Sequence, residues 1–175
     1  ASIGVHAEKP VPQEPELRIG FAQAKSGALS GEAKSTLARN PLFPWLLAIN
    51  SKQTLSAASN AQVLGVINID PKDPSNLWLL EQWRAELIRR QDWSSMAMLD
   101  ARFTDSSVAN RCAVLLSVLE AGRNDLWQQN ALAIWQHEAK PATHCQRVFD
   151  ALNQRQAFSA QQLWQRFDRL LADGA

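Results

Sequence analysis

The residues of this sequence that could do chemistry are few, and the first to consider are its histidines and cysteines. His137 and His144 flank a turn that Pro141 breaks, while His6 lies near the start of the chain. This spacing fits no zinc motif, in which ligands recur at short fixed intervals. His144 precedes Cys145, but consecutive residues on a helix point about 100° apart, so a thiolate pair is not favoured. We therefore expect no metal site and solvated histidines.

The carboxylates and glycines show no catalytic pattern either. The sequence has no nucleophile-elbow, Walker or dinucleotide-binding glycine motif, so no cofactor is expected. The helical glutamates lie in the pattern of a solvated face, without the apolar setting that gives a general acid a raised pKa. They are Glu81, Glu86, Glu120 and Glu138.

Tryptophan is the most unusual feature of the composition, because the chain has seven tryptophans and no tyrosine. Five of them lie at helical spacing among Leu and Ala, which favours packing in the core for most: Trp78, Trp83, Trp127, Trp135 and Trp164. A remainder exposed on a concave face would stack against sugar rings, and nearby arginines would meet carboxylates. The candidate contacts for a glycan or a partner are Trp83, Arg84, Arg89 and Arg90. A solvated face is the alternative for these arginines.

The elements that would position these residues are helices. From residue 16 onward, apolar residues recur every three or four positions, which predicts an all-α fold. The expected helices span 16–26, 31–39, 43–50, 55–67, 76–90, 92–99, 106–121, 125–138, 142–153 and 160–172. The β-branched stretch 63–69 could be a strand, but no second strand-like run exists to pair with it, so we assign it to a helix.

Several of these helices have recognisable starts. Ser75, Asn124 and Ser159 each place a side-chain acceptor where a helix begins, and Ser159 forms a capping box with Gln162. Pro141 cannot continue the preceding helix and suits the first turn of the next one.

The domain organisation expected is one helical domain over residues 16–175. Residues 1–15 carry three prolines and no apolar periodicity, which is typical of an extended, disordered segment. A formal net charge of +1, with both signs distributed along the chain, makes nucleic-acid binding an unfavoured function. No apolar run is long enough to span a membrane, which requires about 20 residues.

An internal repeat relates the two cysteines. The pattern Cys112-x-x-Leu115-Leu116 recurs 33 residues later as Cys145-x-x-Val148-Phe149, and each copy precedes a second helix rich in Trp or Phe. This period is typical of stacked helical hairpins, although chance similarity between amphipathic helices is an alternative. Equivalent positions on packed helices come close enough for a disulfide, and two buried free thiols are the competing interpretation.

Three short strings resemble a known family in order and spacing. They are FAQAK at residues 21–25, NPLFPWLL at 40–47 and ELIRRQDW at 86–93, and the similarity continues through both cysteines over about residues 16–173. This stretch resembles the N-terminal superhelical domain of soluble lytic murein transglycosylases. The resemblance implies stacked antiparallel hairpins in a right-handed, U-shaped superhelix, a periplasmic location, and a disulfide between Cys112 and Cys145.

The family's activity is not expected of this chain. The family cleaves the glycan of peptidoglycan with a glutamate of a separate lysozyme-like domain, whose motifs are Glu-Ser, Gly-Leu-Met-Gln and Ala-Tyr-Asn. This sequence has no Tyr and no Glu followed by Ser. We therefore expect a non-catalytic module that binds or organises peptidoglycan, as the scaffold of a transglycosylase or as a truncated relative. The alternative is a free-standing periplasmic interaction module that holds a partner protein or peptide in its groove.

Overall fold

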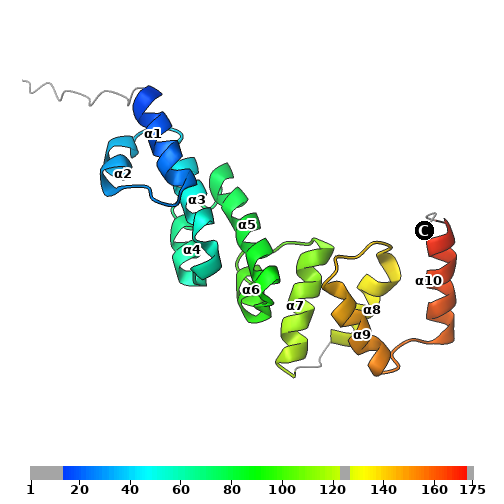
Figure 1. Ribbon diagram of the computed structural model, residues 1–175. Helices are drawn as coiled ribbons and strands as arrows, with labels where there is room; N and C mark the ends of the chain where they lie inside the picture. The colour runs from blue at the N-terminus through cyan, green and yellow to red at the C-terminus, as the bar shows by residue number, and fades with distance from the viewer. Residues whose placement is uncertain (1–13, 123–126, 173–175) are drawn as a thin grey trace, which may run out of the picture. The chain divides into compact units, whose positions relative to one another are not determined.

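The computed structural model describes residues 14–122 and 127–172, and within these ranges the regular secondary structure is helical throughout (Figure 1). The elements are α1 (Glu14–Lys25), α2 (Gly31–Leu37), α3 (Phe43–Gln53), the short 3₁₀ helix η1 (Leu55–Ala57), α4 (Asn60–Ile67), α5 (Pro74–Arg90), α6 (Trp93–Asp100), α7 (Val108–Glu120), α8 (Trp127–His137), α9 (Cys145–Gln154) and α10 (Ala160–Ala172). The all-α prediction is confirmed, and the β-branched stretch is helical as far as Ile67.

One expected helix, over 55–67, is in fact two elements. The 3₁₀ turn η1 ends at Ala57, and α4 then begins with a capping box of its own. The Ser59 backbone N–H donates to Gln62 Oε1 at 2.8 Å, while the Ser59 hydroxyl accepts from the Gln62 backbone N–H. These two hydrogen bonds satisfy backbone N–H groups at the start of α4, so a new helix can begin after the turn.

The other predicted helix starts have different outcomes. Ser159 and Gln162 do form the expected capping box, with the Ser159 N–H donating to Gln162 Oε1 at 2.8 Å. Ser75 is not the cap of its helix, because α5 begins one residue before it and the Ser75 N–H donates to Asp73 Oδ1 at 2.8 Å. The carboxylate of Asp73 therefore satisfies this helix start.

Three further expectations concern chain between or outside the helices. Pro141 separates α8 from α9 as expected, but it lies in the connection and not in the first turn of α9, which begins at Cys145. Asn124 lies outside the described residues, as do residues 1–13 of the expected N-terminal segment, and α1 already begins at Glu14.

The chain divides into two compact units, one ending at Glu86 and one beginning at Leu87, so that the boundary falls inside α5. Each unit has its own core and is described by itself. The expected single domain over 16–175 concerns how these units combine, and it stays a prediction.

One core cluster of the first unit is built by α1, α2 and α3. Ala24, Leu29, Leu37 and Leu46 form its buried centre. Gly20 of α1 lets the helices approach closely, because a Cβ at this position would lie 2.5 Å from Leu37 Cδ1.

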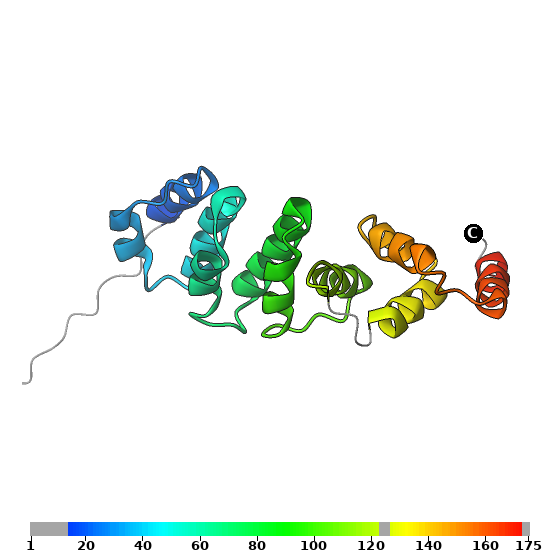
Figure 2. The same cartoon turned by 90° about the horizontal axis from the view of Figure 1, so that it is seen from below.

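In the second unit, α7 packs against α6, α8 and α9, and α8 also packs against α9. Figures 1 and 2 both show α10 at the edge of this unit, beyond α8 and α9. The buried apolar side chains come from five helices: Leu87 of α5, Trp93, Met96 and Leu99 of α6, Cys112, Ala113, Leu115 and Leu116 of α7, Trp127, Ala131 and Ile134 of α8, and Cys145, Val148, Phe149 and Leu152 of α9. None of the buried residues belongs to α10.

Candidate binding surfaces and the polar cluster around Arg147

The two cysteines form a disulfide, which confirms the pairing that the family resemblance implied. The bond joins Cys112 of α7 to Cys145 of α9, whose Cα atoms are 5.2 Å apart, and both side chains are fully buried. Their repeat neighbours Leu115 and Val148 are buried as well, so residues 33 positions apart occupy equivalent environments. The bond therefore fixes α7 to α9 at corresponding points of the repeat.

The predicted glycan contacts on α5 are placed very differently from one another. Trp83 is only 1% exposed, and its indole N–H donates to Asn60 Oδ1 of α4 at 2.6 Å. Its ring is part of the core and offers no face to a sugar. Arg84 is partly buried in the same unit, whereas Arg89 is exposed and Arg90 partly buried in the second unit. Whether these arginines serve one ligand stays a prediction.

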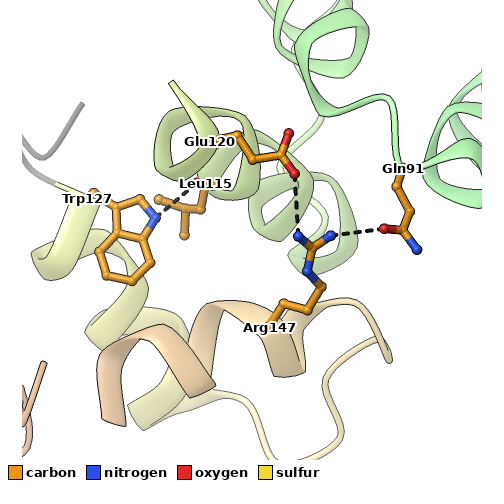
Figure 3. A network of polar contacts seen from close by, with 5 residues as sticks. All are labelled: Gln91, Leu115, Glu120, Trp127 and Arg147. Atoms are coloured by element: carbon orange, nitrogen blue, oxygen red, sulfur yellow. Dashed lines mark hydrogen bonds and ion pairs between the residues drawn. The ribbon is translucent and has the colours of Figure 1, made fainter. Parts of the chain in front are cut away.

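A polar cluster around Arg147 lies on the surface of the second unit (Figure 3). The Arg147 guanidinium donates to Gln91 Oε1 at 3.1 Å, and a second nitrogen forms an ion pair with Glu120 at 3.4 Å. Gln91 has a positive φ of 57°, and the next backbone N–H, that of Asp92, donates to the Leu87 carbonyl oxygen at 2.9 Å. This is the left-handed ending of a helix, which usually requires glycine. Here the position is occupied by Gln91, whose side chain binds Arg147.

The same arginine also lies against an aromatic pair. Its guanidinium is 5.7 Å from the centre of the Trp93 ring, and His144 stacks on this ring at 5.8 Å. His144 Nε2 is 2.7 Å from the Ala109 carbonyl oxygen, which fixes the imidazole against α7, so the expectation of a solvated histidine is wrong for His144. Arg147 thus already has an amide, a carboxylate and a ring as partners. The cluster ties α9 to the turn after α5 and to α7, and it lacks the arrangement of a general acid–base site.

Two aspartates begin helices and have perturbed acidities. Hydrogen bonds from the Ser75 hydroxyl and backbone lower the pKa of Asp73. For Asp92, burial acts to raise the pKa, but hydrogen bonds from Ser95 and Ser94 and the charge of Arg90 outweigh it and lower the pKa. Both shifts follow from helix capping, because the ionised carboxylate is the better acceptor for N–H groups at a helix start.

Four exposed apolar side chains of the second unit lie together on α10. Its side chains Leu163, Trp164, Phe167 and Leu171 are all exposed, Trp164 at 66%. The helix contacts α8 with its other face: Arg166 lies 4.7 Å from the centre of the Trp135 ring and donates to the Glu138 carbonyl oxygen at 3.2 Å. Burial lowers the pKa of Arg166. Helical spacing favoured core packing for Trp164, and this expectation is wrong for Trp164 because none of the described helices packs against this face of α10.

A cavity of about 270 Å³ lies between α1 and α2 in the first unit. Its lining includes Ile19, Leu37 and the carboxylates Glu16 and Glu32. Both glutamates are exposed to solvent, so they lack the apolar surroundings that tune a carboxylate for acid catalysis.

Neither a metal cluster nor a membrane-spanning helix occurs among the residues that the structure describes. Within residues 14–122 and 127–172, no group of three or more His, Cys, Asp or Glu side chains is arranged to hold a metal ion. None of the helices in these ranges is long and apolar enough to cross a membrane.

Comparison with known proteins found no matching family model, no similar curated protein and no similar solved structure. The relation to the transglycosylase family is therefore a proposal.

Proposed function

We propose that this chain is a non-catalytic helical module of the periplasm that binds peptidoglycan and is related to the superhelical domain of soluble lytic murein transglycosylases. The observation that carries the proposal is the disulfide between Cys112 and Cys145. It joins equivalent positions of a 33-residue repeat, and the family has bonded cysteines at these places. Disulfides persist in oxidising compartments, which supports the periplasmic location.

The proposed architecture is a right-handed superhelix of stacked antiparallel hairpins. In support, α7 contacts both α8 and α9, and α8 contacts α9, as in two successive hairpins of a helical repeat. Such stacks present long surfaces that suit extended ligands, and a glycan strand is an extended ligand.

Binding without cleavage is proposed because the family's catalytic motifs have no counterpart in the sequence. The polar cluster around Arg147 agrees with this assignment, because Glu120 is occupied by an ion pair and is about half exposed. A general acid is instead usually held in an apolar site shielded from water.

The test is sedimentation of the purified chain with insoluble peptidoglycan. We expect the chain to be retained and the peptidoglycan to release no anhydro-muropeptides. The matched control is the same chain with insoluble cellulose, which presents sugar rings without peptides or carboxylates. Equal retention on cellulose, or none on peptidoglycan, would refute the binding function, and released anhydro sugars would refute the non-catalytic assignment.

A second candidate function is capture of a partner protein, and the exposed stripe of α10 favours it. Single exposed apolar residues are ordinary, but four large ones on one helix face mark an interaction surface. The test is cross-linking in a periplasmic extract with the chain and with its Trp164→Ala and Phe167→Ala variants. A partner that is captured by the chain and lost in both variants would support this function, whereas equal capture would exclude this face.

A further inference from the structure

Two tryptophans of the first unit form a partly exposed pair. Trp45 of α3 and Trp78 of α5 have ring centres 5.9 Å apart and planes inclined by 50°. Both rings are partly accessible, whereas Trp83 on the same α5 is buried in the core. This pair is therefore the tryptophan surface that the first unit presents to solvent.

The polar edges of these two rings are unoccupied. Among the residues that the structure describes, neither the Trp45 nor the Trp78 indole N–H donates a hydrogen bond to protein. By contrast, the Trp83 N–H reaches Asn60 at 2.6 Å, and the Trp127 N–H reaches the Leu115 carbonyl oxygen at 2.9 Å. A tryptophan that is not needed for core packing keeps both an apolar face and a donor for a ligand.

A positive charge lies beside the pair. The ammonium of Lys52 is 5.6 Å from the centre of the Trp78 ring. Trp45, Ile49 and Lys52 lie at helical intervals of four and three residues on α3, so they share one face of this helix. Lys52 is exposed, and within the described ranges it forms no ion pair with a carboxylate. Its charge is therefore available to an anionic ligand.

We propose that Trp45, Trp78 and Lys52 form a binding site for a carboxylate-bearing saccharide. The C–H face of a sugar ring is apolar and stacks on an indole, while its hydroxyl and amide oxygens accept hydrogen bonds from the two N–H groups. The Lys52 ammonium binds the carboxylate. This proposal rests on the proposed function, because it locates a contact with peptidoglycan and specifies the acidic sugar as the unit recognised.

The site is open and small, and this limits its affinity for a single sugar unit. Two rings and one exposed charge bury little of the ligand, so a single disaccharide binds with a Kd on the order of 1 mM. A glycan strand repeats the same unit, and multivalent contact then raises the apparent affinity without new contacts. A short soluble sugar is therefore the right probe of the site, and insoluble peptidoglycan is the right probe of the whole function.

The experiment is an NMR titration of the indole N–H signals of the full chain. The probe is a disaccharide of N-acetylglucosamine and N-acetylmuramic acid, which carries one carboxylate, and the neutral comparison is di-N-acetylglucosamine. Trp45→Phe and Trp78→Phe assign the two signals while keeping an aromatic ring at each position. We expect these two signals to move on addition of the acidic sugar, and each variant to bind it more weakly.

Lys52→Met isolates the charge, because it keeps an apolar stem of similar length. We expect it to weaken binding of the acidic disaccharide by about threefold to fivefold, as for an exposed ion pair, and to leave binding of the neutral one unchanged. The matched control is Lys72→Met at another exposed lysine of the same unit, which should change neither.

Two results would overturn the site. One is movement of other indole signals only, and the other is an equal loss of binding in the Lys52→Met and Lys72→Met variants. If the chain still sediments with peptidoglycan in either case, the proposed function stands and only the site is wrong. If the chain binds neither the acidic disaccharide nor insoluble peptidoglycan, both the site and the proposed function are wrong.

Discussion

The helices α8 and α10 occupy the same place in the 33-residue repeat, yet only α8 is covered on its apolar face. Residues Trp127, Ala131 and Ile134 of α8 are buried, with Trp127 only 1% exposed. The equivalent residues of α10, found by the same offset, include Trp164 and Phe167, which are 66% and 51% exposed. α8 packs against both α7 and α9. No described helix covers the apolar face of α10.

This difference separates two properties that an amphipathic sequence pattern combines. The pattern determines which residues share a face of a helix, and α8 and α10 both have an apolar face. Whether this face contributes to stability depends on what packs against it, because apolar surface stabilises only when it is removed from water. The same type of residue is therefore part of the core in one helix and part of a potential interface in the other.

Truncating the tryptophan of α8 and that of α10 should give the largest difference in the free energy of unfolding. Trp127→Ala removes a buried ring, its hydrogen bond to the Leu115 carbonyl oxygen and the surface on which Arg155 lies, at 4.9 Å from the ring centre. We expect it to lower the free energy of unfolding by about 3–5 kcal/mol. Trp164→Ala should change it by less than about 0.5 kcal/mol. Urea denaturation of both variants measures this.

Equal losses in the two variants would contradict the comparison, since they would mean that the face of α10 is covered in solution. Trp127→Phe serves as the control for Trp127→Ala, because it keeps most of the buried ring and removes only the N–H donor. Its loss should be smaller than that of the alanine variant.

Removal of the disulfide should have the next largest effect, and it should act on α7 and α9 without affecting α10. The double variant Cys112→Ala with Cys145→Ala opens a loop of 33 residues. The unfolded chain then gains freedom, which lowers the free energy of unfolding by about 3–4 kcal/mol in the chain-entropy model. Amide exchange should accelerate throughout α7 and α9 and remain unchanged in α10. An acceleration in α10 as well would show that α10 unfolds together with the core.

The sequence was sufficient to predict most of the helices, because their signals are local. Apolar periodicity and capping residues are properties of neighbouring positions, and the capping box of Ser159 with Gln162 was found in this way. The errors arose where two local signals competed. Asp73 and Ser75 can both cap a helix, and the carboxylate, which is the stronger acceptor, forms the cap of α5.

The binding surfaces were harder to predict, because burial depends on contacts between distant parts of the chain. Trp83 was named as a candidate glycan contact, but its ring is buried and Asn60 of another helix accepts its N–H. Nothing in the sequence indicated a pairing of Trp45 with Trp78, because this pairing requires two helices to come together. Periodicity along one helix contains no information about such partners.

The smallest effect concerns helix caps, which can be compared between a covered and an uncovered helix. Ser107 begins α7 and Ser159 begins α10, and each hydroxyl accepts a backbone N–H at 3.2 Å, from Asn110 and Gln162 respectively. Ser107→Ala and Ser159→Ala should each destabilise their own helix by about 1 kcal/mol. Different measurements should nevertheless detect the destabilisation of α7 and that of α10.

Opening of α7 exposes buried residues such as Leu116 and breaks contacts with three other helices, so it coincides with global unfolding. Ser107→Ala should therefore lower the free energy of unfolding in urea. α10 buries none of its residues and can open by itself, so Ser159→Ala should leave the urea midpoint unchanged and accelerate amide exchange in α10 alone. A shift of the midpoint by Ser159→Ala as large as that by Ser107→Ala would mean that α10 belongs to the cooperative core. In that case its exposed stripe could not be regarded as an independent interaction surface.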